Sequence, residues 1–276
     1  MSLLSGSGLG NAAPPIQIRV VSLPSAPVVD GSLGEWGKEG WSSVPLHPAK
    51  EGDGDNFTGV LTVELKAGVF GERIYLAARW PDPAADMEYR PWKWIGSQYK
   101  RSKQRDDMLA VRFDMGGDYA DCMFSKTDYK VDLWQWSAGR SDKVGLAEDF
   151  TQIISTSMQE SAAEYEIPGG GTVYIRKVRD SGDPLYENTE APAEKQSDTL
   201  PGIKVLNGGS GSLVDVSAKG VWKDGFWSLE LSRKLDTSHD DDVKLTGIKE
   251  IRGAVAVFNN GYAEHKSVSD TLMFVF

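Results

Sequence analysis

The sequence predicts an all-β protein, an antiparallel β-sandwich with long loops and a few short helices. Short apolar runs with period-two alternation recur along the chain, as expected for strands that bury one face. Glycine, proline and Asp-Gly pairs separate these runs, and such residues mark turns. No long stretch has the 3.6-residue periodicity of an amphipathic helix. Together these observations favour many short strands joined by turns.

The first part of the chain predicts a lead-in strand, a helical turn and a hairpin. Residues 14–29 are rich in proline and valine and alternate at their start, which predicts an extended lead-in and a first strand. Residues 30–36 begin with an Asp-Gly turn signal and predict a helical turn that carries Trp36 and Trp41 inward. Residues 61–80 contain two alternating runs around a Phe-Gly-Glu-Arg turn, so they predict a β-hairpin.

The rest of the chain predicts two long irregular segments and further strands. Residues 86–106 are aromatic and basic and predict a long structured loop. Residues 158–215 are rich in glycine, serine, proline and acidic residues, which predicts a long surface excursion outside the core. The remaining strands are predicted at residues 108–115, 214–222, 226–231, 251–258 and 271–276, with an Asp-Gly turn between the second and the third.

Length and composition indicate an ordinary globular protein. The 276 residues are 40% hydrophobic and 25% charged, enough for a buried core. We expect one domain over residues 1–276. Residues 1–13 lack the basic and apolar regions of a signal peptide, so we expect a flexible N-terminus or a cloning scar there.

The net charge of −10 restricts the possible partners. Nucleic acid and anionic membrane surfaces are disfavoured, because binding to them needs a basic face. No apolar run reaches the roughly 18 residues that cross a bilayer, so no membrane span is expected. An acidic surface suits a basic protein partner, although it also serves solubility alone.

Few residues suggest chemistry. The three histidines, His47, His239 and His265, lack the spacing of a metal motif. His239 and the three aspartates after it could bind a metal, or they could form an exposed acidic loop. The single cysteine, Cys122, excludes an internal disulfide and a cysteine-rich metal site. Met123 beside it offers a soft sulfur ligand for haem iron or copper, or a flexible core side chain.

Six stretches occur in order along the chain: residues 30–36 (Asp-Gly-Ser-Leu-Gly-Glu-Trp), 106–113, 132–136 (Asp-Leu-Trp-Gln-Trp) with Arg140, 222–227 with 233–235, 255–258 and 265–269. This ordered series resembles the haem-binding γ subunits of molybdenum enzymes related to dimethyl sulfoxide reductase, such as ethylbenzene and dimethyl sulfide dehydrogenases and chlorate and selenate reductases. The resemblance extends from Val29 to the C-terminus. Some relatives carry C-x-x-C-H and bind haem covalently. Here the frame reads Tyr-Ala-Asp-Cys-Met over residues 119–123, so two thioether bonds are impossible.

The resemblance implies a non-covalent haem b whose iron has methionine and lysine axial ligands. It places these ligands at Met123 and Lys266. His265 is the alternative to Lys266, and only one of the two can point at the iron, because adjacent side chains on a strand face opposite sides. Candidate walls of the haem slot are Phe113, Met115, Phe124, Trp134 and Trp136, and candidate propionate contacts are Arg140, Arg112, Lys126 and Arg105.

The function that the resemblance implies is electron transfer, with no substrate chemistry in this chain. The chain would act beside an iron–sulfur β subunit and a molybdopterin α subunit of a periplasmic enzyme, and would exchange electrons with a soluble c-type cytochrome or a similar carrier. Three alternatives stay open. The sandwich also resembles family 9 carbohydrate-binding modules, which would use exposed tryptophans and no haem. The chain could be a structural subunit that has lost its cofactor, or a copper protein that uses Cys122, Met123 and a histidine.

Overall fold

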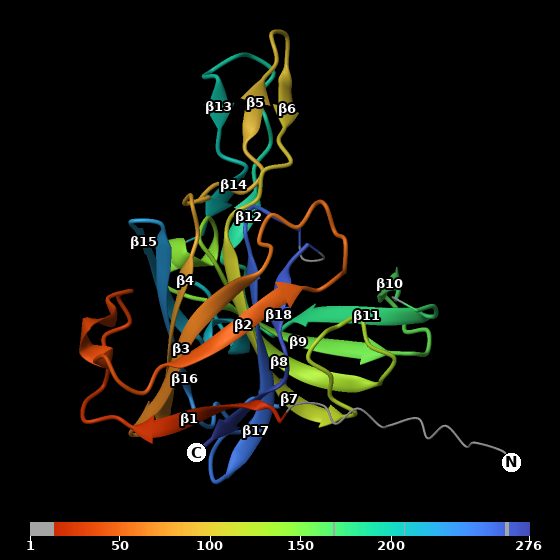
Figure 1. The fold of residues 1–276 in the computed structure, drawn as a ribbon. Coiled ribbons are helices and arrows are strands. Elements are labelled where there is room, and N and C mark those ends of the chain that lie inside the picture. The colour runs from red at the N-terminus through yellow and green to blue at the C-terminus, as the bar shows by residue number, and fades with distance from the viewer. Residues whose placement is uncertain (1–13, 168, 207, 263–264) are drawn as a thin grey trace, which may run out of the picture.

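The computed structural model describes residues 14–167, 169–206, 208–262 and 265–276. The prediction for residues 1–13 lies outside these ranges. Most strands join one sheet of 14 strands, in the order β10-β11-β9-β8-β7-β17-β18-β2-β3-β4-β16-β15, with β1 and β19 paired to its members (Figure 1). The pairings are antiparallel except for those of β1 with β19 and with β3. The all-β antiparallel sandwich is therefore confirmed.

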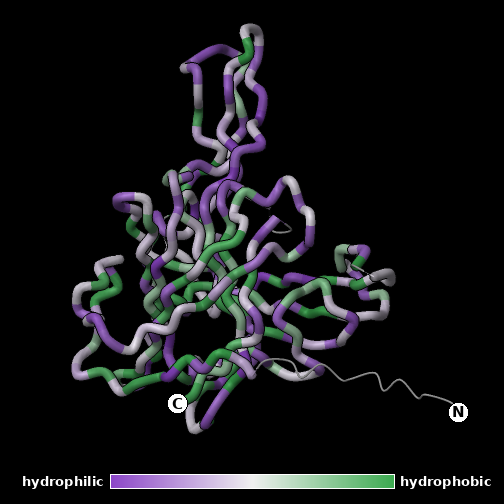
Figure 2. Tube along the Cα trace, viewed as in Figure 1, coloured by the Kyte–Doolittle hydropathy of each residue, from purple (hydrophilic) through white to green (hydrophobic). Residues whose placement is uncertain are grey.

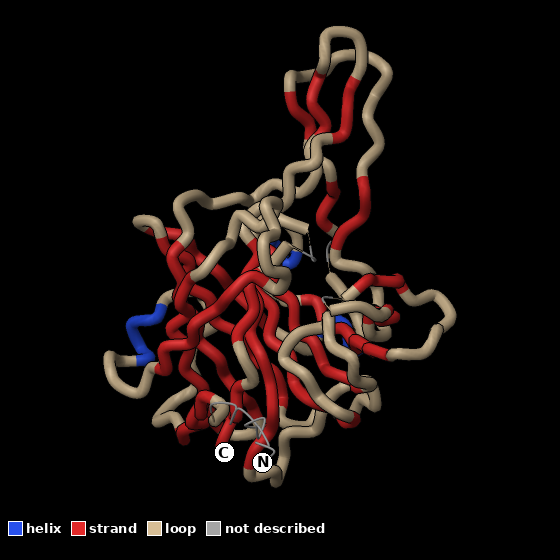
Figure 3. The backbone as a smooth tube through the Cα atoms, turned by 45° about the vertical axis from the view of Figure 1, so that its right-hand side comes forward, coloured by secondary structure: helices blue, strands red, loops and turns tan. Residues whose placement is uncertain are grey.

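The strands of the large sheet have the following bounds: β1 (Ile16–Ser22), β2 (Ser42–Pro48), β3 (Leu61–Phe70), β4 (Arg73–Pro81), β7 (Met108–Gly117), β8 (Tyr129–Ser137), β9 (Glu148–Ser155), β10 (Ala163–Glu166), β11 (Thr172–Arg179), β15 (Ser217–Lys223), β16 (Phe226–Lys234), β17 (Glu250–Phe258), β18 (Ser267–Ser269) and β19 (Leu272–Val275). Two small sheets contain β5 (Trp92–Trp94), β6 (Tyr99–Arg101) and β13 (Thr199–Leu200), and β12 (Tyr186–Asn188) with β14 (Ile203–Val205). The helices of the described residues are short 3-10 turns, η1 (Leu33–Trp36), η2 (Ser141–Val144) and η3 (Ser212–Val214), and Figure 3 shows how strands and loops dominate.

The large sheet curves so that its two halves enclose the main apolar core. Alternate residues of β3, β4 and β16 enter this core from one side, and those of β7, β8 and β17 enter from the other. Trp80, Trp136 and Trp227 meet at its centre, with ring centroids 5.0–6.3 Å apart. Hydrophobic segments accordingly gather inside the sandwich (Figure 2). No helix of the described residues has the length and apolar character needed to cross a membrane.

The local turn signals predicted the hairpins correctly. β3 and β4 pair around the turn before Arg73, and β15 and β16 pair around Asp224 and Gly225. Both of these turn residues have positive φ, 52° and 81°, as a type I′ turn requires. The helical turn predicted within residues 30–36 forms at Leu33–Trp36 and buries Trp36, whereas Trp41 is only partly buried.

Two predicted irregular segments contain more structure than expected. Residues 86–106 include β5 and β6, which form an arm with β13 that projects from the sandwich (Figure 1). Residues 158–215 were expected to lie outside the core, but β10 and β11 extend the large sheet beyond β9. The reason is apolar burial, because Val173 and Ile175 of β11 are buried against residues of β8 and β9. The glycine and serine content concealed this alternating strand.

Candidate functional site

A cavity lies against β7, β8, β9 and β17, on the face of these strands opposite to the main core. Alternation decides which side chains reach it. Ala110 and Leu133 line the cavity, whereas their neighbours Leu109 and Trp134 enter the core. The cavity encloses about 60 Å³, within a hollow of about 510 Å³ free of protein atoms that includes open solvent. Its apolar walls are completed by Ala254, Ala256, Phe258 and Val268.

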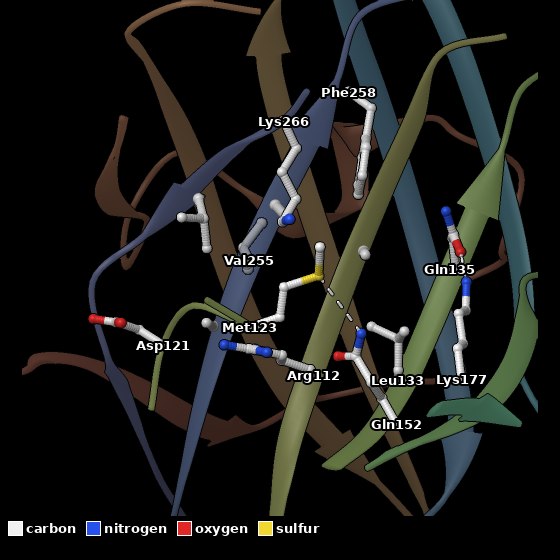
Figure 4. Close-up of a pocket in the computed structure, with 14 residues that line it drawn as sticks. Arg112, Asp121, Met123, Leu133, Gln135, Gln152, Lys177, Val255, Phe258 and Lys266 are labelled. Carbon is white, nitrogen blue, oxygen red and sulfur yellow. Dashed lines mark hydrogen bonds between the residues drawn. The ribbon is translucent and has the colours of Figure 1, made fainter. Parts of the chain in front are cut away.

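Met123 reaches the cavity from the loop between β7 and β8, residues 118–128 (Figure 4). Two hydrogen bonds fix this loop beside Met123. Arg112 Nη2 donates to the Ala120 carbonyl at 2.7 Å, and the Tyr129 hydroxyl donates to the Cys122 carbonyl at 2.9 Å. The Met123 side chain is buried, and Gln152 Nε2 approaches its sulfur at 3.8 Å. The loop therefore holds a thioether over the sheet.

Lys266 reaches the same cavity from the segment just before β18. Its side chain is buried, and its Nζ lies 5.1 Å from the ring centroid of Phe124. Its carbonyl accepts hydrogen bonds from the Ala49 amide at 2.9 Å and from Asn56 Nδ2 at 2.8 Å, which fix the backbone here. Figure 4 shows the Lys266 amine and the Met123 sulfur pointing into one space. Residues 143 positions apart in sequence thus converge on one cavity.

His265 points elsewhere. Its Nδ1 lies 2.7 Å from Asp53 Oδ2, and its ring packs against Tyr262. It lines a different hollow, together with Phe57 and Tyr262. Of the two candidates for the second ligand, Lys266 is therefore the one whose side chain lines the cavity.

The predicted aromatic walls need correction. Phe113, Trp134 and Trp136 are fully buried in the main core and do not line the cavity. Their positions in β7 and β8 alternate with the cavity-facing residues, so they point to the opposite face of the sheet. Met115 is half-buried and also lies outside the lining. Phe124 packs beside Met123 and approaches the amine of Lys266.

Of the four predicted propionate contacts, only Arg112 lines the cavity. Arg140 does not: its guanidinium pairs with Asp106 at 3.0 Å and contacts the Met108 sulfur at 2.7 Å. Lys126 donates to the Gly169 carbonyl, and Arg105 stacks on Tyr262, so neither of these cations lines it.

Lys177 of β11 is a cavity residue that the sequence did not reveal. Its Nζ donates to Gln135 Oε1 and lies 3.6 Å from the ring centroid of Phe150. Lys177 is exposed as a residue, but desolvation of its amine lowers the pKa of Lys177 to about 7, although Glu148 acts to raise it. The regular alternation of Val173, Ile175 and Lys177 is the signal that could have revealed it.

The cavity lining carries an excess of positive charge although the chain is acidic. Arg112, Lys177 and Lys266 line it, against one carboxylate, Asp121, among the described residues. A lining of this kind suits an apolar ligand with acidic substituents.

The donor set fits a haem. A thioether and an amine are both iron ligands, and the cationic side chains suit the propionates. The enclosed space is smaller than the several hundred Å³ of a usual cofactor site, so a macrocycle would have to displace the loop of residues 118–128 or the Lys266 side chain.

Comparisons with known proteins give a family match and several likenesses to solved structures, two of which follow. The sequence profile of the family described as "Ethylbenzene dehydrogenase" matches residues 34–269. No curated protein sequence matches this chain. A protein from Bacteroides uniformis ATCC 8492 described as carbohydrate-binding is 10% identical, with a TM-score of 0.42, over 95% of this chain and 100% of that chain. A family 9 carbohydrate-binding module from Caldicellulosiruptor kristjanssonii, in complex with glucose, is 12% identical, with a TM-score of 0.37, over 94% of this chain and 95% of that chain.

Proposed function

This chain belongs to the ethylbenzene dehydrogenase family, and on that premise we propose that it is a haem b electron-transfer subunit. The observation that carries the proposal is the convergence of Met123 and Lys266 on one apolar, cationic cavity. When bound, the haem would supply one-electron oxidation and reduction at its iron. The protein would supply ligands, charge and exclusion of water.

Each lining residue has a role in this proposal. The Met123 sulfur would ligate the iron, and Gln152, 3.8 Å from it, would orient the thioether. The Lys266 amine would ligate only in its neutral form. Arg112 and Lys177 would pair with the propionates. A methionine ligand raises the reduction potential of a haem, so we expect a potential higher than that of a haem with two nitrogen ligands.

The family match supports the proposed partners. We propose that the chain associates with an iron–sulfur subunit and a molybdopterin subunit, in the periplasm, and exchanges electrons with a soluble c-type cytochrome or a similar carrier. In this assembly another subunit would catalyse the reaction of the substrate.

Two of the alternatives lack a supporting observation. Sugar binding would need exposed tryptophans, but none of the strongly exposed large apolar side chains in the described residues is a tryptophan. A copper site would need a histidine beside Cys122, and among the described residues no cluster of candidate metal ligands includes Cys122.

Haem titration of the purified chain tests the proposal. We expect uptake of one haem per chain, with a low-spin visible spectrum and a reversible change on reduction. Met123→Leu and Lys266→Leu should each abolish the low-spin spectrum, because each removes one axial ligand. The matched controls are His265→Ala, next to Lys266, and Cys122→Ser, next to Met123, and both should retain it.

Two results would contradict the proposal. One is a chain that remains colourless with excess haemin. The other is a low-spin spectrum that survives in Lys266→Leu but disappears in His265→Ala, which would reassign the second ligand.

A further inference from the structure

A second cluster of polar side chains lies where three chain segments meet away from the haem cavity. Asp180 follows β11, and Asp241 and Asp242 belong to the loop between β16 and β17. Each of the three aspartates offers a carboxylate oxygen within 4.8 Å of those of the other two. The Thr151 hydroxyl of β9 adjoins them, 3.2 Å from Asp180 Oδ1 and 3.2 Å from the Asp241 carbonyl. The cluster thus presents only oxygen atoms.

Two carboxylate oxygens of this cluster are buried without a hydrogen-bond partner. They are Oδ2 of Asp180 and Oδ2 of Asp242, in side chains that are 5% and 8% exposed as residues. His239 Nδ1 lies 3.9 Å from the Asp242 oxygen, and this nitrogen pairs with Asp215 at 2.6 Å. Buried carboxylate oxygens are costly unless something binds them, so these two atoms indicate a missing ligand.

The neighbouring guanidinium group of Arg233 does not neutralise the negative charge of this aspartate cluster. Arg233 is fully buried, and its Nη1 lies 2.6 Å from Asp132 and 3.0 Å from the other oxygen of Asp242. Within the described part of the chain, neither Asp180 nor Asp241 forms an ion pair. The cluster is therefore short of positive charge on the side away from Arg233.

We propose that Asp180, Asp241 and Asp242 form a Ca²⁺ site. Calcium takes several oxygen ligands in flexible geometry, and the Thr151 hydroxyl and the Asp241 carbonyl offer further oxygens at the edge. A surface hollow lined by Ser181, Ser212, His239 and Asp241 gives access from solvent. The nearby group of Asp132, Asp149 and Asp242 is less suitable, because Arg233 already lies against all three carboxylates.

Calcium would tie separate segments of the chain together. Ser212, in the long segment after β11, already donates to Asp241 Oδ2 at 2.7 Å. Asp180 lies three residues after Lys177, so the ion would anchor the end of the strand that lines the haem cavity. The proposal itself does not depend on haem binding.

Calcium titration of chelator-treated full-length protein tests the site. We expect one Ca²⁺ per chain by calorimetry and a higher Tm with Ca²⁺ than with chelator, because the ion binds only the folded state. Tb³⁺ should show luminescence sensitised by tryptophan, since the Trp134 ring lies 4.7 Å from the Arg233 guanidinium beside the cluster.

Asp180→Asn and Asp241→Asn should each weaken Ca²⁺ binding by about 10-fold or more. These two positions are preferred to Asp242, whose pairing with Arg233 also supports folding. Asp240→Asn is the matched control, because this exposed residue of the same loop carries the same charge outside the triad, and it should change the affinity by no more than about two-fold. The proposal is overturned by a lack of saturable Ca²⁺ binding, by an unchanged affinity in Asp180→Asn, or by selective Zn²⁺ binding that is lost in His239→Ala.

Discussion

Replacement of Arg233 by methionine tests how the sandwich tolerates its buried charges. Arg233 is fully buried and lies 2.6 Å from Asp132, 3.0 Å from Asp242 and 3.5 Å from Asp149. Its Nη2 also donates to the Val243 carbonyl at 2.7 Å. Methionine keeps much of the side-chain length and removes the charge, so three buried carboxylates would lose their shared cation.

The structure sets the expected size of this effect. Removal of one partner from a buried ion pair costs about 3–5 kcal/mol, which corresponds to a Tm lower by roughly 10 °C for a chain of this length. The cost should depend on pH. Burial and the Asp132 charge already raise the pKa of Asp149, and loss of Arg233 raises it further. When a carboxyl group has a raised pKa in the folded state, the protein loses stability as pH rises above the pKa of that group in the unfolded chain, which is near 4. Arg233→Met should therefore be more destabilised at pH 8 than at pH 5.

Urea denaturation at pH 5 and pH 8, with chelator present, measures this effect. The matched control is Arg252→Met, because Arg252 pairs with Asp114 at 2.7 Å but is 42% exposed, and its loss should cost less than about 1 kcal/mol. The reasoning fails if Arg233→Met costs no more than the control, or if its cost does not increase between pH 5 and pH 8.

Three further predictions concern the core, the N-terminal turn and the cavity. Gly220→Ala would place a Cβ 2.2 Å from Cζ2 of Trp136. Urea denaturation should therefore show a loss of about 1–3 kcal/mol in the free energy of unfolding. An unchanged free energy of unfolding would mean that Trp136 moves freely. Glu230→Ala removes the acceptor of the Trp36 indole N–H at 2.6 Å and of two backbone N–H groups. The same assay should therefore show a loss of roughly 3 kcal/mol in the free energy of unfolding, and a loss below about 1 kcal/mol would contradict this. Desolvation of its amine lowers the pKa of Lys177 to about 7, so the folded chain binds fewer protons there than the unfolded chain, and stability should rise from pH 7 towards pH 10. Lys177→Met should flatten this rise in denaturation curves and weaken haem binding, and an unchanged pH dependence would argue against a lowered pKa of the amine.

The hairpins could be predicted because their signals are local. The turn of Asp224 and Gly225 needs only two residues with positive φ, and the alternation on either side sets the pairing. The position of β11 could not be predicted in this way. Its pairing with β9 depends on apolar contacts of Val173 and Ile175 with other strands, and the surrounding glycines and serines indicated a loop.

The candidate ligands could be predicted, but the walls of the site could not. The sequence indicated Met123 and Lys266 through the stretches that resemble the γ subunits, and both residues line the cavity. The walls depend on which face of β8 is inward. Almost every residue of β8 is buried. Because neither face of this strand is exposed, the alternation of Leu133, Trp134 and Gln135 did not show which face is turned to the core. The sequence therefore could not show that Trp134 and Trp136 belong to the core.

The separation of the cavity from the main core has a consequence for biogenesis. The two occupy opposite faces of β7, β8 and β17, so the apolar core closes without any contribution from a cofactor. Under the proposed function, the chain would then fold first and take up haem as a later, separate step of maturation. The segments that must yield for this step, the loop of residues 118–128 and the segment around Lys266, lie outside the main core. Cofactor supply would then limit how many chains become active, without limiting how many chains fold.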